Sequence, residues 1–173
     1  MSNDVPEILD AWRMVAARRG FEGRLPLSSM PRLQEALADA EGGDVAFSLD
    51  FDRDAMLVPY VELRIDAGLP LVCQRTLRRF VLPVALVQRL GLIRDEADEA
   101  GLPEGYEPLL LAEDGGLRPA ELVEDELILA VPVVPVEPGS EGVERDWPVT
   151  TEEEVRANPF SALAALKKQE RNN

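Results

Sequence analysis

The sequence of 173 residues contains no histidine, and Cys73 is its single cysteine. Without histidine, neither a serine–histidine–aspartate triad nor a cysteine–histidine pair can form. One cysteine cannot make an intramolecular disulfide, which fits a reducing compartment better than secretion. These absences remove the usual forms of nucleophilic catalysis, although paired carboxylates could still do acid–base work. No cofactor is expected.

Long apolar runs are also missing, since none approaches the ~18 residues that a membrane span requires. The opening residues lack the basic start and apolar middle of a signal peptide. A cytoplasmic protein without a membrane partner is therefore expected. The apolar fraction of 46% is sufficient for a single hydrophobic core in a chain of this length.

Acidic residues dominate, and the formal net charge is -15. The charge is nevertheless segregated. Residues 67–94 contain five arginines and no acidic residue, whereas residues 95–154 contain nineteen acidic residues and two arginines. A clustered basic stretch can contact phosphates, and an acidic region attracts basic proteins. The sequence therefore predicts two poles of opposite charge.

Alternating apolar and polar residues predict the strands of a sheet. The alternation covers residues 44–51 and residues 61–66, and these two strands are expected to pair as an antiparallel hairpin. Residues 80–93 predict another strand, in which Pro83 favours an edge or a bulge. A short strand is expected within residues 106–112.

Helical spacing predicts helices on both sides of these strands. The expected helices are residues 4–20 with Asp4 as the cap, residues 29–42 with Ser29 as the cap, and residues 119–130. Residues 94–105 are expected to form an acidic loop. The fold class is therefore α+β, with an antiparallel sheet flanked by helices on its N-terminal and C-terminal sides.

The C-terminal part has a different composition. Prolines at positions 132, 135 and 138 predict an extended segment. We expect residues 1–138 to form a single α+β domain. Residues 139–173 are expected to be a polar linker that ends in a short tail helix beginning at Asn158.

The stretch CQRTLRR, which begins at Cys73, fits neither strand alternation nor helical spacing and predicts a turn. Cys73 is expected to be a small buried residue. Arg75, Arg78 and Arg79 would project outward from such a turn, and their guanidinium groups suit phosphate contacts. The candidate nucleic-acid-binding residues are these three arginines, and a merely solvated turn is the alternative.

Acidic residues crowd the expected helix at residues 119–130. The candidate partner-binding residues are Glu121, Glu124, Asp125 and Glu126. Like charges three or four positions apart weaken a helix slightly. The cluster is interpreted either as a docking site for a basic protein or as an ordinary solvated face.

Three stretches together resemble one known family. VCQRTLRRF, YEPLLLAEDGGLRPAELVEDELILAVPVVPVEP and NPFSALAALKK are similar, in this order and spacing, to the YceD family of large ribosomal RNA subunit accumulation proteins. The resemblance implies a non-catalytic factor of ribosome assembly. It also implies two candidate partners, large-subunit ribosomal RNA and a small basic large-subunit ribosomal protein. DNA is not expected as a partner.

The resemblance includes one departure. Many family members carry CQRC, a later PVVPVH and another cysteine, a set that looks like a zinc site. Here the second cysteine position is Thr76 and the histidine position is Glu137, and no counterpart of the final cysteine is expected. Structural zinc needs four sulfur or nitrogen ligands. No metal is therefore expected.

The sequence leads to two hypotheses. In the first, a ribosome biogenesis factor supports accumulation of large-subunit (23S) ribosomal RNA by binding RNA, a basic large-subunit ribosomal protein, or both. In the second, an acidic chaperone holds such a basic protein and never contacts RNA.

Overall fold

The computed structural model describes residues 5–39, 41 and 43–140. The chain divides into two compact units, Met1–Ser140 and Glu141–Asn173, and the structure describes residues of the first unit only. The expected tail helix and most of the polar linker lie outside the described residues. No helix in the described part is long and apolar enough to cross a membrane.

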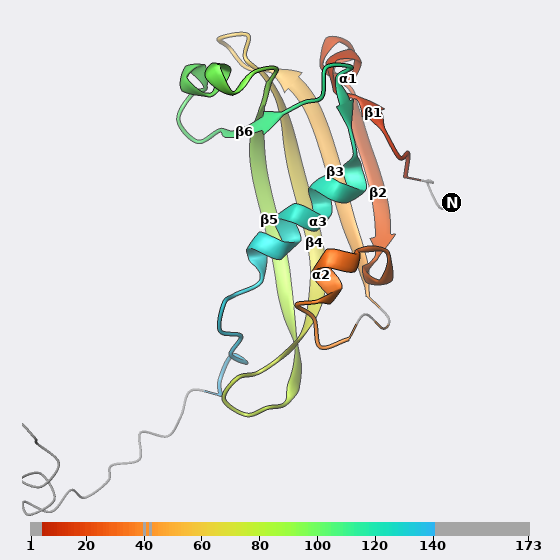
Figure 1. Cartoon of the computed structure of the whole chain (residues 1–173), viewed down its shortest axis with the longest axis vertical. Helices are drawn as coiled ribbons and strands as arrows, with labels where there is room; N and C mark the ends of the chain where they lie inside the picture. Colours follow the sequence, from red (N-terminus) through yellow and green to blue (C-terminus); the bar gives the residue numbers. More distant parts are fainter. Residues whose placement is uncertain (1–4, 40, 42, 141–173) are drawn as a thin grey trace, which may run out of the picture. The chain divides into compact units, whose positions relative to one another are not determined.

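A five-stranded sheet forms the centre of the first unit (Figure 1). Its strands follow the order β2-β3-β4-β5-β6. The strands are β2 (Gly20–Pro26), β3 (Asp44–Arg53), β4 (Pro59–Val72), β5 (Arg79–Ile93) and β6 (Glu107–Leu110). A separate two-stranded sheet pairs β1 (Leu9–Asp10) with β7 (Gly116–Leu117). The α+β class is confirmed.

The β3–β4 hairpin is confirmed, and so is the alternation that predicted it. Leu49 lies opposite Leu63 in the antiparallel register, and both side chains are fully buried. The residues one position away, Asp50 and Glu62, form the next pair on the other face. Side chains of successive strand residues point to opposite faces, so a local pattern of period two determines which residues form the core.

β5 is confirmed as a strand, and Pro83 lies at a sheet edge as expected. β6 covers only residues 90–93 of β5, so residues 79–89 have a strand neighbour on one side alone. The direction of β6 differs from the expected antiparallel arrangement, because β6 runs parallel to β5. The chain returns through residues 94–106 before it enters β6, and a four-residue strand carries no sequence signal of its direction.

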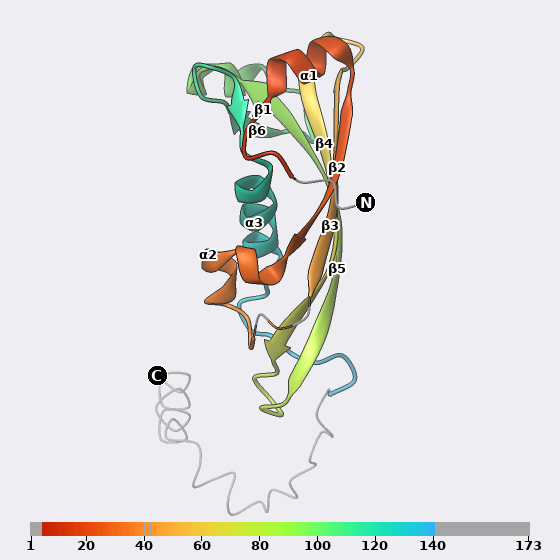
Figure 2. The ribbon, with the colours of Figure 1, turned by 90° about the vertical axis from the view of Figure 1, so that its right-hand side faces the viewer.

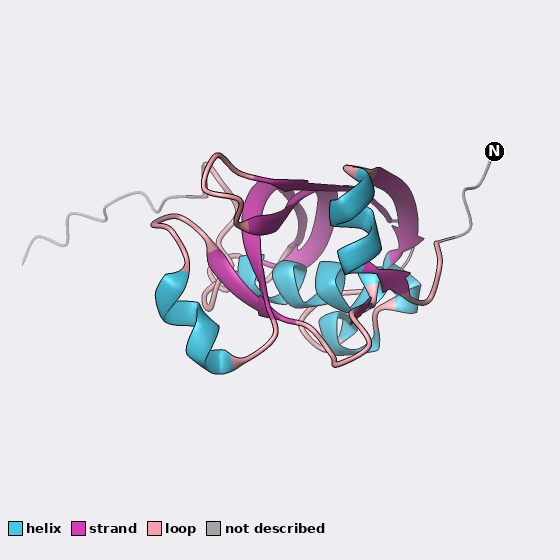
Figure 3. Cartoon of the chain, turned by 90° about the horizontal axis from the view of Figure 1, so that it is seen from above, coloured by secondary structure: helices cyan, strands magenta, loops and turns pink. Residues whose placement is uncertain are grey.

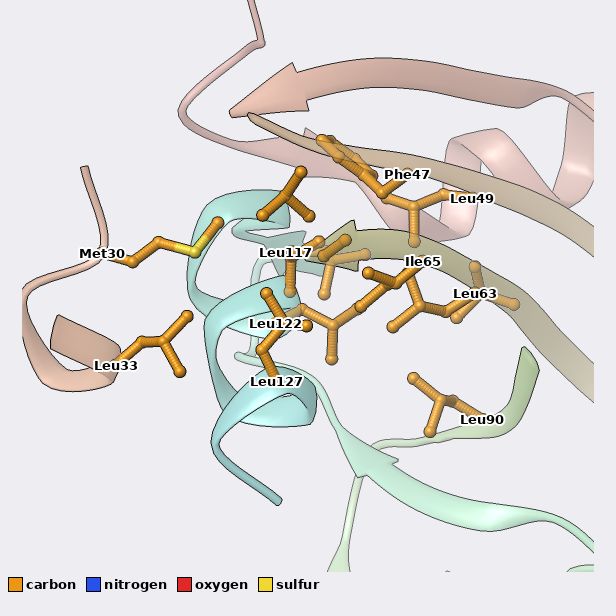
Figure 4. Packing of buried hydrophobic residues seen from close by; sticks show 14 of the residues in the cluster. Met30, Leu33, Phe47, Leu49, Leu63, Ile65, Leu90, Leu117, Leu122 and Leu127 are labelled. Carbon is orange, nitrogen blue, oxygen red and sulfur yellow. The ribbon is translucent and has the colours of Figure 1, made fainter. Parts of the chain in front are cut away.

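Helices α2 (Pro31–Gln34) and α3 (Pro119–Ala130) lie on one side of the sheet (Figure 2). Seen from above, the sheet curves around the helices (Figure 3). Leu122 and Leu127 of α3 pack toward Leu63 and Ile65 of β4 (Figure 4). The predicted helix at residues 119–130 is confirmed, and Pro119 begins it.

The first helix is shorter than expected. α1 spans Ala11–Ala17, and its cap is Asp10, whose carboxylate accepts the N–H of Arg13 at 2.9 Å. The predicted start at Asp4 is wrong. Leu9 and Asp10 pair with β7, and the N–H of Ala11 donates to the carbonyl of Gly115. These long-range bonds keep residues 9–10 extended and postpone the helix by one turn or more.

The second predicted helix, residues 29–42, is also wrong in its bounds. A 3-10 turn, η1, covers Leu27–Ser29, and the Ser29 hydroxyl donates to the carbonyl of Pro26 instead of capping a helix. α2 ends at Gln34. The N–H of Ala38 would bond the carbonyl of Gln34 if the helix continued, but it donates to the carbonyl of Pro70 on β4 instead. Tertiary contacts therefore shorten the helix.

The expected acidic loop contains a short 3-10 helix, η2 (Glu96–Gly101). Asp95 caps it, and a reciprocal capping box joins Asp95 and Asp98. The Asp95 carboxylate accepts the N–H of Ala97 at 2.8 Å. Acidic side chains are favourable at the beginning of a helix, which explains how this negative segment is ordered.

Candidate functional site

The predicted turn at CQRTLRR joins β4 to β5. The N–H of Cys73 donates to the carbonyl of Arg78 at 2.9 Å, and the N–H of Leu77 donates to the carbonyl of Cys73 at 2.8 Å. Leu77 has a φ of 56°, a left-handed conformation that is unusual for a residue with a branched side chain. All residues from Gln74 to Arg79 are exposed. The turn is closed by its own backbone bonds and presents its side chains to solvent.

Cys73 is the exception within this turn, because its side chain is fully buried. Its Sγ accepts the backbone N–H of Glu137 at 3.4 Å and lies 3.8 Å from the hydroxyl of Ser140. The Glu137 N–H, followed by the Thr76 hydroxyl, lowers the pKa of the thiol to about 6, although burial acts in the opposite direction. The prediction of a buried cysteine is confirmed.

The proline-containing segment is fixed to this turn. The N–H of Gln74 donates to the carbonyl of Pro135 at 2.8 Å, and the Arg75 guanidinium donates to the carbonyl of Ser140 at 3.0 Å. Together with the two contacts to the Cys73 sulfur, these bonds join residues that lie more than sixty positions apart. Residues 131–138 leave regular structure as expected, but they bend at residues 131, 133 and 134 instead of running straight, and they dock against the β4–β5 turn.

The residues around Cys73 do not fit a zinc ion. Within residues 5–39, 41 and 43–140, no group of three or more cysteine, histidine, aspartate and glutamate side chains could hold a metal. Glu137 directs its backbone N–H at the sulfur, and hydroxyl groups fill the neighbouring positions. A zinc ion needs lone pairs directed at it, whereas here the N–H of Glu137 and the Thr76 hydroxyl donate to the sulfur, and the Ser140 hydroxyl donates to the carbonyl of Glu137. Hydrogen bonds therefore close this turn.

The three candidate arginines are brought together but differ in their contacts. Arg79 donates to both carboxylate oxygens of Asp39, at 2.5 and 3.1 Å, and this bond lowers the pKa of the Asp39 carboxyl. Arg75 contacts a carbonyl and no carboxylate among the described residues. Arg78 is exposed and has no salt bridge within the described part of the chain. No carboxylate of residues 5–39, 41 and 43–140 therefore matches the positive charges of Arg75 and Arg78.

The four candidate acidic residues of α3 are in different environments. Glu124 is buried, and its carboxylate accepts the backbone N–H groups of Arg32 at 2.7 Å and Leu33 at 3.1 Å. The Arg32 guanidinium also bonds Asp125 at 2.6 Å. Glu124 therefore bonds inside the protein and is not part of an exposed docking surface, although the sequence predicted that it would be.

Glu121 and Glu126 are the other two members of the acidic cluster. Glu121 lies 3.5 Å from Arg118, one helical turn earlier. Glu126 is half-buried, and burial raises the pKa of its carboxyl, as do the neighbouring charges of Glu107 and Asp125. Three residues of the cluster, Glu121, Asp125 and Glu126, therefore still reach the surface.

Sequence reasoning missed two residues that determine this arrangement. Arg32 organises two acidic residues of α3, and it lies 92 positions from Glu124. Ser140 bonds both the turn and the carbonyl of Glu137. No local pattern reveals either contact, because each depends on how distant segments meet.

The fold and the turn together define a class of small α+β protein. In this chain a helix-covered sheet carries a hairpin turn that is tied to a proline-containing segment. A family model described as "Large ribosomal RNA subunit accumulation protein YceD" matches residues 61–167, and the chain belongs to this family. The resemblance noted in the sequence is confirmed.

A relative from Haemophilus influenzae supports the same assignment. That protein is named "Large ribosomal RNA subunit accumulation protein YceD", and it is 28% identical to this chain over 177 residues. The match covers 95% of this chain and 97% of the relative. No solved structure matches the chain.

Proposed function

We propose that this protein is a non-catalytic cytoplasmic factor that supports accumulation of large-subunit ribosomal RNA. Membership of the YceD family is the observation that carries the proposal. The relative from Haemophilus influenzae has the corresponding name and matches nearly the whole chain. The buried Cys73 thiol is held by hydrogen-bond donors, an arrangement that suits a structural role better than nucleophilic catalysis.

In this proposal Arg75 and Arg78 contact RNA phosphates. Both are exposed on a turn that backbone bonds hold in place, so the backbone of the turn loses little freedom when they bind. Arginine presents a planar set of donors that matches phosphate oxygens. Arg79 is the weaker candidate of the three, because its guanidinium already bonds Asp39.

A basic large-subunit ribosomal protein is the second proposed partner. Glu121, Asp125 and Glu126 would contact it from the exposed side of α3. Asp125 is the weaker candidate of the three, because its carboxylate already bonds Arg32. A basic partner would offset the repulsion between these like charges, which lie close together on one helix. If only this contact operates, the protein acts as an acidic holder and does not bind RNA.

Depletion of the protein in cells tests the proposed role. We expect the ratio of large-subunit to small-subunit ribosomal RNA to fall, and restored expression to correct it. An unchanged ratio would contradict the role. Binding measurements on purified protein distinguish the two mechanisms, because RNA binding through two arginines weakens as salt rises, with a slope of about -1.4 to -1.8 on logarithmic axes. A holder would show no RNA binding at any salt concentration.

A further inference from the structure

A surface pocket lies at the opposite end of the β4–β5 hairpin from the Cys73 turn. Pro59 begins β4 there, and Leu92 lies near the end of β5. An extended strand of this length separates the two ends by roughly 40 Å. The pocket has a volume of about 390 Å³, which is within the range of small-molecule sites. It is therefore distinct from the turn that carries Arg75 and Arg78.

An aromatic ring and two arginines line this pocket. Trp12 comes from α1, Arg53 from the end of β3, and Arg94 from the residue after β5. The Arg94 guanidinium carbon lies 4.6 Å from the centre of the Trp12 ring, a distance typical of a cation–π contact. The Arg94 guanidinium carbon thus lies over the Trp12 ring within one concave site.

The charges of the two arginines are not matched by salt bridges in the part of the chain that the structure describes. Arg53 donates to the carbonyl of Leu57 at 3.0 Å. Asp98 also lines the pocket, but its carboxylate faces the backbone N–H groups of Arg94 and Asp95, at 3.4 and 3.3 Å. The lining residues therefore carry a net charge of +1, beside the acidic segment η2.

Arg89 offers an internal comparison. Its guanidinium lies 4.9 Å from the centre of the Tyr60 ring and also bonds Glu62 at 2.9 Å. Arg89 therefore contacts both an aromatic ring and a carboxylate that matches its charge. Among the described residues Arg94 has only the Trp12 ring as a partner, so its charge is available to a ligand that brings its own anion.

We infer that the pocket of Trp12, Arg53 and Arg94 binds one unpaired nucleotide of single-stranded RNA. The base stacks on the outer face of the Arg94 guanidinium, which itself lies on Trp12, and Arg53 contacts the adjacent phosphate. Unpaired bases in RNA complexes stack on arginine planes as well as on aromatic rings. This inference rests on the proposed function, and it adds a second RNA contact beyond the arginine turn.

Tryptophan fluorescence tests the inference directly. The chain has two tryptophans, so Trp147→Phe leaves Trp12 as the only reporter. We expect a short single-stranded oligouridine or oligoadenine RNA to change the Trp12 emission saturably. A double-stranded RNA of the same length is expected to change it much less. RNA that binds without any change in Trp12 emission would overturn the inference.

Two substitutions in the Trp147→Phe protein separate stacking from charge. Arg94→Ala is expected to weaken RNA binding about tenfold. Arg94→Lys keeps the positive charge but removes the planar guanidinium on which the base would stack. We therefore expect this variant to lose most of the change in Trp12 emission. Arg13→Ala is the matched control, since Arg13 follows Trp12 on α1 and is exposed. Equal effects of Arg94→Ala and Arg13→Ala would contradict the pocket.

Filter binding of the same RNA shows whether a negative result concerns only the pocket or the proposed RNA-binding function as a whole. If the protein binds RNA and Arg75→Glu/Arg78→Glu weakens it while Trp12 stays silent, only the pocket is wrong. If no RNA binds under any salt condition, the RNA mechanism itself fails. Thermal melting of each variant shows whether the fold is retained, and Arg94→Lys remains informative if Arg94→Ala is unstable.

Discussion

Glu124 of α3 and Arg32 of α2 are joined by three hydrogen bonds, one from the backbone N–H of Arg32 and two from its guanidinium. The carboxylate is buried, and it also accepts the N–H of Leu33. One acidic side chain therefore holds α2 against α3. This contact explains why a four-residue helix is ordered at all, since isolated helices of this length are unstable.

The role of Glu124 predicts a large effect on stability. Glu124→Ala leaves two backbone N–H groups without their acceptor, and we expect a loss of roughly 3 kcal/mol in the free energy of unfolding. Asp125→Asn changes an exposed carboxylate on the same helix and is expected to cost less than about 1 kcal/mol. Urea denaturation measures both. Similar costs for the two substitutions would show that the buried carboxylate is not what holds α2.

Leu127 and Leu129 form a matched pair on α3. Leu127 is fully buried in the core, whereas Leu129 is 76% exposed. We expect Leu127→Ala to cost about 3 kcal/mol, because it removes buried methyl groups and leaves a cavity. Leu129→Ala is expected to change the free energy of unfolding by less than about 0.5 kcal/mol. A cost at Leu129 that equals the cost at Leu127 would mean that α3 packs on the sheet through its other face.

The contacts of Cys73 predict that the stability of the folded protein depends on pH, and they determine the direction of the change. The N–H of Glu137 and the Thr76 hydroxyl lower the pKa of the thiol to about 6, whereas a cysteine in an unfolded chain has a pKa of about 8.5. The folded protein then binds fewer protons than the unfolded chain between these pH values. The contribution of the thiolate to the free energy of unfolding is therefore fully present above about pH 8.5, and it is lost as the pH falls through 6.

Two measurements check this pH dependence. The thiolate absorbance near 240 nm of the folded protein should titrate with a midpoint of about 6. The difference in melting temperature between the native protein and Cys73→Ser should grow as the pH rises from 6 to 8.5. A midpoint near that of an ordinary cysteine, with a constant melting difference, would contradict the bonding described for the sulfur.

The turn around Cys73 leads to two predictions about metal binding, one for the native protein and one for a variant with added ligands. Chelator should leave the melting temperature of the native protein unchanged, since hydrogen bonds close the turn. Ser140 Oγ lies 3.8 Å from Cys73 Sγ, about the separation of two sulfurs on one tetrahedral zinc ion. The variant Thr76→Cys/Glu137→His/Ser140→Cys is therefore expected to bind cobalt with visible absorption bands. A native protein that chelator destabilises would show that a metal takes part after all.

Local patterns in the sequence predicted some parts of the fold well. The alternation in β3 and β4 determines which residues are buried, because neighbouring residues face opposite sides of a strand. The turn at Cys73 was recognisable since it fits neither period. Pro119 likewise indicated the start of α3.

The parts that could not be predicted depend on long-range contacts. Because Leu9 pairs with Leu117, α1 begins later than its sequence predicts. Because the N–H of Ala38 donates to the carbonyl of Pro70, the helix that begins at Pro31 does not continue to residue 42. The burial of Glu124 follows from Arg32 and Leu33, which lie about ninety positions away. An acidic cluster in a sequence therefore does not reveal which of its members remain exposed.

The central claim is that Arg75 and Arg78 let an acidic protein contact large-subunit ribosomal RNA. The most direct measurement is the ratio of large-subunit to small-subunit ribosomal RNA in depleted cells that express Arg75→Glu/Arg78→Glu. Arg24→Glu, a charge reversal of an exposed residue on β2, is the control. We expect the ratio to stay low with the double variant and to recover with the control. Full recovery with the double variant would contradict the account.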